Sequence, residues 1–344
     1  MKVFINGKFL TYRQTGAQRY AREIVACLDD ICQPGEMVMV LPQGEWEIPT
    51  YKNIKVKQIS PLKGLLWEQI TFPLYVIWNK AVSLNLCNVA PIFSPGFSAI
   101  FDMKIKSFPQ FFSWKFRVWY NILFMNQTRR CKAIFTDSYD AKNEILKFYP
   151  KTKPQIFPAH GSWQHFNRIG YDEQALEKYQ LDKGAFYFAM GSLEPNKNFK
   201  WVAEVAKQNP NDTFAVAGSL NSKVFTNGLG FECPSNMKLL GFVSDEEAKT
   251  LMRDAKAFLF PSFCEGFGMP PLEALSAGVS AVIVSDIPVM HEIFMDNAVY
   301  INPSHFNYNL DQLIDGSSFD SKSVLSRFSW ETSAKIIYKE ISKH

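Results

Sequence analysis

Two glutamates eight residues apart, Glu265 and Glu273, flank a glycine-bracketed loop in the second half of the chain. Gly266 and Gly268 allow a backbone to approach a ligand closely, and the amides there can donate to it. Carboxylates suit polyols because each offers several acceptor sites. The spacing therefore predicts that one carboxylate accepts hydrogen bonds from sugar hydroxyls, and the other, one helical turn further on, from a ribose.

The elements around this loop form a repeating pattern. Apolar stretches that end at glycine or polar residues predict strands at Ala185–Met190, Thr213–Ala217, Ala257–Phe260 and Ala281–Val284. Helices are expected at Phe199–Lys207 and Pro271–Ala277, with Gly278 closing the second. A further helix starts at Ser244, where serine is the N-cap and acids fill the first turn.

The first half alternates in the same way, with predicted strands at Lys2–Asn6, Met37–Leu41 and Ala133–Thr136 and a helix over Ala17–Leu28. Alternation of this kind favours α/β architecture with doubly wound parallel sheets. The 344 residues suit two domains. We expect an N-terminal domain over 1–165, a C-terminal domain over 166–328 and a helix over 329–344 that returns to the first domain. Ligands of such folds bind at the carboxyl ends of the strands, which predicts a cleft between the domains.

Composition narrows the class of protein. Apolar residues make up 47% and charged residues 20%, which excludes global disorder, and no apolar run reaches the length of a membrane span. Six cysteines without a Cys-x-x-Cys pair or a histidine at metal spacing indicate a reduced, cytoplasmic chain. No basic helix or basic-aromatic ladder follows a nucleic-acid reading motif, so no nucleic-acid partner is expected.

Charge is unevenly distributed along the chain. Residues 1–170 hold 22 Lys and Arg against 11 Asp and Glu, a net +11, whereas the remainder carries −7. A basic half suits phosphate-bearing substrates or an anionic membrane face. An aromatic run lies in this half, and a helix over 113–125 would place Phe116, Trp119 and Leu123 on one face, most simply as core packing. Its lysine and arginine residues also fit peripheral contact with an anionic leaflet.

The run Glu265–Glu273, with Ala274 and Gly278, resembles the E-x7-E motif of retaining glycosyltransferases of family 4, which have the GT-B fold of two facing Rossmann-like domains. The similarity extends to the N-terminal loop and helix at 15–24 and to the diphosphate loop at 191–198. Segments 66–70, 108–112 and 119–120 resemble the mannosyltransferase-like subgroup of polysaccharide and O-antigen assembly.

The resemblance implies a role for each matching residue. Lys197 would neutralise the donor diphosphate as leaving group, beside Gly191 in the same loop. Glu265 would hold hydroxyls of the donor sugar, and Glu273 the ribose. The backbone at Gly266, Phe267 and Gly268 would contact the donor, and Gly16 would let the N-terminal loop pass close to the diphosphate.

The resemblance also implies a reaction: transfer of a hexose, mannose favoured, from a GDP- or UDP-linked donor to a saccharide or lipid-linked acceptor. The resemblance to a retaining family also implies that the anomeric configuration is retained. Independence from metal is expected, because no Asp-x-Asp motif occurs and GT-B enzymes generally need no metal, and no cofactor is expected. Such an enzyme would be cytoplasmic or peripheral at the inner face of the membrane.

Two positions depart from the subgroup. Phe101 stands where a histidine that contacts the donor sugar is expected, and Ser192 and Asn196 stand where an arginine usually accompanies the diphosphate lysine. Arg19 is a candidate replacement for that arginine. These departures motivate an alternative of another class, a non-catalytic paralogue that binds a nucleotide sugar or a partner. A nucleotide-sugar epimerase on the same fold is the other alternative.

Overall fold

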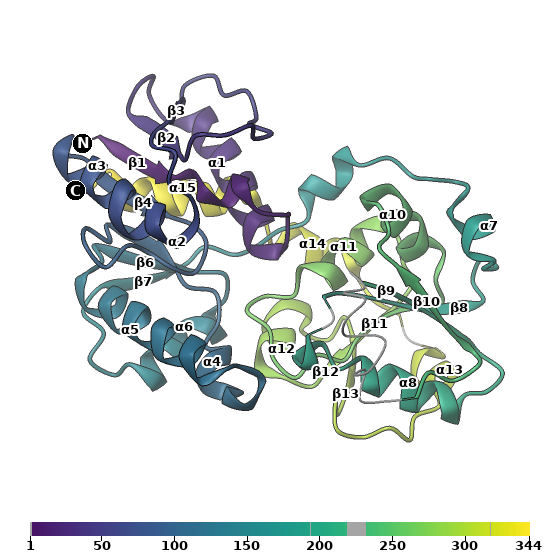
Figure 1. Cartoon of the computed structure of the whole chain (residues 1–344). Coiled ribbons are helices and arrows are strands. Elements are labelled where there is room, and N and C mark those ends of the chain that lie inside the picture. Colours follow the sequence, from purple (N-terminus) through teal and green to yellow (C-terminus); the bar gives the residue numbers. More distant parts are fainter. Residues whose placement is uncertain (1, 193, 219–231, 317) are drawn as a thin grey trace. The chain divides into compact units, whose positions relative to one another are not determined.

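The computed structural model describes residues 2–192, 194–218, 232–316 and 318–344 (Figure 1). They form two compact units, Met1–Gly161 with Ser329–His344, and Ser162–Phe328. Each unit is built on one sheet whose strands all run parallel, which confirms the predicted α/β class.

The first unit holds a seven-stranded sheet in the order β3-β2-β1-β4-β5-β6-β7. Its strands are β1 (Val3–Asn6), β2 (Met37–Leu41), β3 (Lys55–Gln58), β4 (Val82–Asn85), β5 (Phe97–Ala99), β6 (Ala133–Thr136) and β7 (Gln155–Pro158). Its helices are α1 (Gly16–Ile31), α2 (Gly64–Leu66), α3 (Phe72–Trp78), α4 (Lys104–Ser107), α5 (Trp114–Arg130), α6 (Tyr139–Phe148) and α15 (Trp330–Ile341). Shorter turns are η1 (Gly7–Thr11), the π-helical η2 (Trp67–Thr71) and η3 (Pro109–Phe111).

The last helix, α15, belongs to the first unit although residues 162–328 intervene, and it packs on α1 (yellow on purple in Figure 1). The Ser333 hydroxyl donates to the His160 carbonyl at 2.7 Å, and the Tyr338 hydroxyl to the Glu36 carboxylate at 2.9 Å. Trp330 packs edge-to-face on Tyr20 of α1. These contacts tie both ends of the helix to residues of the first unit.

The second unit holds a six-stranded sheet in the order β10-β9-β8-β11-β12-β13. Its strands are β8 (Phe186–Met190), β9 (Thr213–Ala217), β10 (Met237–Gly241), β11 (Ala257–Phe260), β12 (Val282–Ser285) and β13 (Val299–Ile301). Its helices and turns are η4 (Gln164–Arg168), α7 (Ala175–Tyr179), η5 (Pro195–Lys197), α8 (Phe199–Gln208), α10 (Asp245–Asp254), α11 (Met269–Ala277), α12 (Pro288–Phe294), α13 (Leu310–Ile314) and α14 (Ser321–Ser326).

Residues 162–165 lie in the second unit because their side chains bond there. The Trp163 indole donates to the Leu325 carbonyl at 2.9 Å, and the Gln164 amide to the Phe328 carbonyl at 2.8 Å. His165 contacts α11, as described below. The chain therefore joins the second unit from Ser162 onward.

The aromatic helix α5 differs from its expected packing. Leu123 and Phe124 are buried, but Phe116 is 38% exposed, so the interpretation of this face as core packing is wrong at that position. The helix is apolar around much of its circumference, so periodicity could not select one buried side.

Candidate functional site

The predicted loop lies between β11 and α11, at the carboxyl end of a central strand of the second sheet. Gly268 caps α11 in the left-handed region, with φ of +103°. A Cβ at this position would lie 2.6 Å from the Met290 methyl carbon, so glycine meets both a backbone and a packing requirement. The Phe267 side chain is buried and packs edge-to-face on Phe328, which anchors the loop in the core.

Lys197 and Glu265 form an ion pair at this edge of the sheet. Lys197 Nζ lies 2.6 Å from Glu265 Oε1, and the two side chains are only 15% and 7% exposed. The ammonium also lies 5.0 Å from the centre of the Phe260 ring. Of the three N–H donors of an ammonium, Glu265 takes one, so the group can also bind a phosphate oxygen.

Residues adjoining this pair carry polar atoms that no protein group satisfies. Asn196 Nδ2 and Ser262 Oγ are buried without a hydrogen-bond partner, while the Asn196 carbonyl accepts from the Phe263 amide at 2.8 Å. Buried polar atoms are nearly always paired, so such atoms indicate a place for a polar ligand or water. Gly191 follows β8 beside the pair, because a Cβ built there would lie 3.7 Å from Lys197 Cγ.

Glu273 lies one turn inside α11 and is 7% exposed. His165 Nε2 lies 2.9 Å from its Oε1, so the carboxylate has a fixed protein partner. The partner comes from η4, far away in sequence. Seven of the predicted site residues lie in the second unit: Gly191, Lys197, Glu265, Gly266, Phe267, Gly268 and Glu273.

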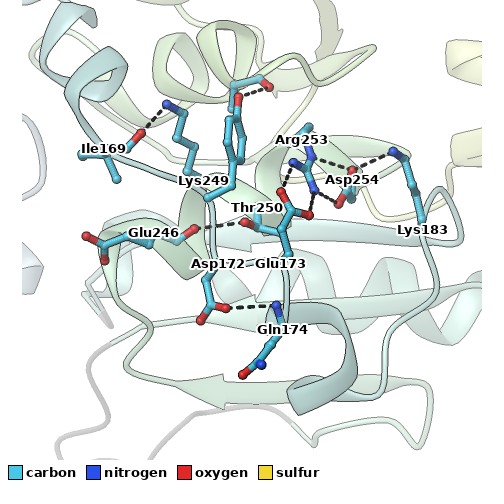
Figure 2. Close-up of polar contacts among 12 residues, drawn as sticks. Ile169, Asp172, Glu173, Gln174, Lys183, Glu246, Lys249, Thr250, Arg253 and Asp254 are labelled. Carbon is cyan, nitrogen blue, oxygen red and sulfur yellow. Dashed lines mark hydrogen bonds and ion pairs between the residues drawn. The ribbon is translucent and has the colours of Figure 1, made fainter.

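A polar network on α10 holds the segment that follows His165 (Figure 2). Lys249 Nζ donates to the Phe166 and Ile169 carbonyls at 2.8 and 2.6 Å, and burial lowers the pKa of this lysine. The Tyr171 ring lies against both Lys249 and Arg253, with its hydroxyl on the Ala277 carbonyl of α11.

Arg253 extends the network by a bidentate pair. Its guanidinium donates to both carboxylate oxygens of Glu173, at 2.8 and 2.9 Å, and to the buried Asp254 at 2.7 Å (Figure 2). Lys183 approaches Asp254 at 3.3 Å from the other side. The contacts fix residues 166–183 on α10, and so position η4.

The remaining sequence positions lie in the first unit. Gly16 is the exposed first residue of α1, and Arg19 lies on the same helix, so neither shares a unit with Lys197. Phe101 is buried and packs on the Tyr20 ring at 4.7 Å, while its amide donates to Asn88 Oδ1. Its side chain is therefore part of the core.

A cavity of about 240 Å³ opens in the first unit where β1 and β4 end. It is lined by Asn6, Lys8, Phe9, Tyr12, Gln18, Glu68, Leu86, Cys87, Val89 and Tyr120. Sequence reasoning missed it, because its residues are scattered from 6 to 120 without a motif. The one available signal was the pair of segments at 66–70 and 119–120.

Charge at this cavity is buried but paired. Lys8 Nζ lies 2.8 Å from Glu68 Oε2, with 13% and 5% of the side chains exposed. Burial acts to lower the pKa of Lys8, but the charge of Glu68 and the hydrogen bond to it raise it above the ordinary value. The Asn6 amide donates to Asn85 at 3.1 Å and to Glu68 at 3.4 Å. Glu68 lies in the π-helical η2, a conformation frequent at functional sites.

Within the described ranges, no group of three or more His, Cys, Asp and Glu side chains could hold a metal ion. Among the helices that the structure describes, none is long and apolar enough to cross a membrane.

Comparisons with known proteins indicate the class of protein. Residues 172–320 match the family described as Glycosyl transferases group 1. The chain is 25% identical over 327 residues to the O-antigen chain mannosyltransferase RfbU of Salmonella typhimurium, covering 88% of this chain and 89% of that protein. It is 28% identical over 225 residues to O-antigen chain mannosyltransferase B of Escherichia coli, with 58% of each chain covered.

Solved structures show the same fold. Sucrose-phosphate synthase from Thermosynechococcus elongatus superposes with a TM-score of 0.71 at 13% identity, covering 99% of this chain and 98% of that one. Anabaena Alr3699/HepE, solved in complex with UDP and glucose, gives 0.69 at 15% identity over the whole of both chains. The fold is GT-B, as predicted. The chain is a glycosyltransferase, and its residues 172–320 form a domain of the glycosyltransferase group 1 family. This result favours the catalytic interpretation over the epimerase and the non-catalytic paralogue.

Proposed function

We propose that this glycosyltransferase transfers mannose, with retained configuration, from a GDP- or UDP-linked donor to a saccharide or lipid-linked acceptor during synthesis of a surface polysaccharide. The relatives named as O-antigen chain mannosyltransferases support the choice of mannose as the sugar and of surface polysaccharide synthesis as the pathway. The observation that carries the proposal is the Lys197–Glu265 pair beside Asn196 Nδ2 and Ser262 Oγ, two buried atoms without a hydrogen-bond partner.

Each of the three charged side chains of the site has a role in this reaction. Lys197 donates to the donor diphosphate and stabilises the charge that develops as the bond from the anomeric carbon to phosphate breaks. Glu265 accepts hydroxyls of the donor sugar, and Glu273, oriented by His165, accepts those of the ribose. The acceptor hydroxyl oxygen bonds to the anomeric carbon, with release of the nucleoside diphosphate and a proton. No metal and no cofactor are part of this scheme.

The two departures from the subgroup pattern fit this assignment in different ways. Asn196 occupies the place expected for an arginine and supplies a neutral donor, its unpaired Nδ2, in place of a second cation. Phe101 supplies no polar contact, because its ring is packed against Tyr20. The donor-sugar pocket therefore relies on Glu265 and on the backbone at Gly266, Phe267 and Gly268.

The cavity of the first unit supplies a place for the acceptor. Its lining combines the aromatic rings of Tyr12 and Tyr120 with the polar groups of Lys8, Glu68 and Gln18. Aromatic faces and fixed hydrogen-bonding groups are the features by which proteins bind a pyranose ring. We assign the acceptor sugar to this cavity, in a protein that meets its acceptor at the inner face of the membrane.

Donor binding tests the proposal directly. GDP, UDP and their mannose and glucose conjugates are titrated calorimetrically into the wild type, Lys197→Ala and Glu273→Ala. Lys207→Ala is the control, at an exposed position of α8. One nucleotide series should bind the wild type, and each site variant should lose about 10- to 100-fold in affinity, as expected for charge-assisted contacts. Equal affinity in Lys197→Ala and wild type, or no binding of any donor, would overturn the assignment.

A further inference from the structure

Exposed apolar side chains are concentrated on two helical segments of the first unit. From the end of α2 through η2 and α3 they recur at Leu66, Ile70, Leu74 and Ile77, next to Trp78, which is 89% exposed. The spacing of three and four residues places them on one helical face. Their opposite face is buried, with Phe72 and Val76 packed against β-strand residues.

Helix α5 carries a second row of the same kind. Trp114, Val118, Ile122 and Met125 are 41–68% exposed and follow the same three- and four-residue spacing. The buried face of α5 is the opposite one, formed by Leu123, Phe124, Gln127 and Thr128. We call the two rows together the apolar face.

Both segments cover the same side of the sheet. The pairing register aligns Phe4 with Val38 on one side and with Ser83 on the other. Asn85 lies two residues after Ser83, so it points to the same face. Asn85 is aligned with Ser98, and Ser98 with Ile134, so Ile134 shares that face too. The α3 segment packs on Phe4 and Val38, and α5 packs on Ile134.

Both segments bond to the same residue, Ile92. Gln69 of η2 accepts the Ile92 amide at 3.0 Å, and Asn126 of α5 donates to the Ile92 carbonyl at 3.2 Å. Phe93, the next residue, is 63% exposed and extends the apolar face between them. Glu68 and Tyr120, on the inner sides of the same two segments, both line the cavity assigned to the acceptor.

The stretch of sequence that contains α5 carries charges of one sign. Residues 103–136 contain seven Lys and Arg and no Asp or Glu. Arg129 and Lys151 line a second cavity, of about 270 Å³, together with Met125 of the apolar face. A basic cavity beside an apolar surface matches a phosphate headgroup above its acyl chains.

We propose that the apolar face docks on an anionic bilayer, with its side chains among the acyl chains and Arg129 and Lys151 on lipid phosphates. Large contiguous apolar surfaces are uncommon on proteins that meet only water. The inference builds on the proposed function, because docking would bring a lipid-linked acceptor to the cavity behind the two segments.

Vesicle co-sedimentation tests it. The full chain is mixed with vesicles of phosphatidylcholine, or of phosphatidylcholine with phosphatidylglycerol, at low and high salt. The wild type should bind the anionic vesicles and lose much of the binding at high salt. Three double variants should each reduce partitioning onto the anionic vesicles about tenfold or more. They are Leu74→Glu with Trp78→Glu, Val118→Glu with Ile122→Glu, and Arg129→Gln with Lys151→Gln.

The control is Phe242→Glu, which introduces the same charge at a position 67% exposed in the second unit and should bind like wild type. Unchanged binding of all three surface variants, or no binding by wild type, would overturn the proposal. Self-association of the wild type that the same variants abolish, without vesicle binding, would assign the face to a second copy instead. Donor affinity measured on the same variants separates the docking proposal from the proposed function. The affinity should be unchanged whether or not the protein docks on the membrane.

Discussion

His165 Nε2 lies 2.9 Å from Glu273 Oε1, and 108 residues of chain separate the two side chains. Both are buried, so the bond fixes the orientation of the carboxylate within α11. The histidine is itself held by its own segment, whose carbonyls accept from Lys249. His165 is thus a positioning residue for Glu273.

Replacing His165 with alanine should weaken nucleotide binding by about tenfold, because Glu273 loses the partner that orients it. Isothermal titration with the preferred nucleoside diphosphate measures this. His165→Gln, which keeps an N–H donor, should recover part of the affinity. His291→Gln is the control, since His291 pairs with Asp286 at an exposed position. Full affinity in His165→Ala would remove the positioning role.

The Lys8–Glu68 pair predicts a large effect on stability. Lys8→Met leaves Glu68 as a buried charge without its partner, which costs about 3–5 kcal/mol when such a pair is broken. Urea denaturation of the two proteins at pH 7 gives the difference. Lys104→Met, at a more exposed pair with Asp102, should cost about 1 kcal/mol or less.

The Lys8–Glu68 pair should also be needed for the cavity to bind a sugar. Saturation-transfer NMR with methyl α-mannoside should show contact in the wild type and loss of it in Glu68→Gln, while donor affinity is unchanged. Contact that is equal in the two proteins would place the acceptor elsewhere.

The network around Asp254 predicts a pH dependence of stability. Burial acts to raise the pKa of Asp254, but the hydrogen bonds and charges of Arg253 and Lys183 outweigh it and bring the pKa below its ordinary value. A carboxylate with a lowered pKa stabilises the folded state above its unfolded pKa of about 4, and this contribution is lost as pH falls through the folded value.

Asp254→Asn should therefore lower the free energy of unfolding by about 1–3 kcal/mol at pH 7. The gap should narrow as pH falls below about 4. Urea denaturation at pH 7 and pH 3.5 measures both. Glu173→Gln, an exposed partner of the same arginine, should change stability much less. A gap that is constant with pH would show that the charge of Asp254 is not responsible.

The two ends of α11 allow strain to be separated from packing. Gly268 and Gly278 have φ of +103° and +104°. A Cβ at Gly268 would meet Met290, whereas a Cβ at Gly278 would lie in open space. Gly278→Ala should cost about 1–2 kcal/mol from backbone strain alone. Gly268→Ala should lower the free energy of unfolding further, because the new Cβ also displaces the Met290 methyl group. Equal denaturation midpoints for the two variants would show that Met290 moves without cost.

Local pattern was sufficient for much of the fold. Thr213–Ala217 and Ala257–Phe260 were predicted with their observed bounds, because buried parallel strands are continuous apolar runs that end at turn residues. The edge strand Lys55–Gln58 was missed, since all four of its residues are exposed and three are polar or charged. The Glu265–Glu273 loop was found from its spacing, but the partnership of Glu273 with His165 was not, because only the tertiary fold joins η4 to α11.

The helix α15 gives the first unit a discontinuous sequence, since residues 329–344 complete a structure begun at residue 2. During synthesis the second unit, which is continuous in sequence, has all of its residues before the first unit does. Until α15 has been synthesised, the α1 surface that it covers with Trp330 and Ile337 is therefore open to water or to chaperones. A stop codon just before residue 329 would consequently remove α15 and damage the half of the protein that was translated first.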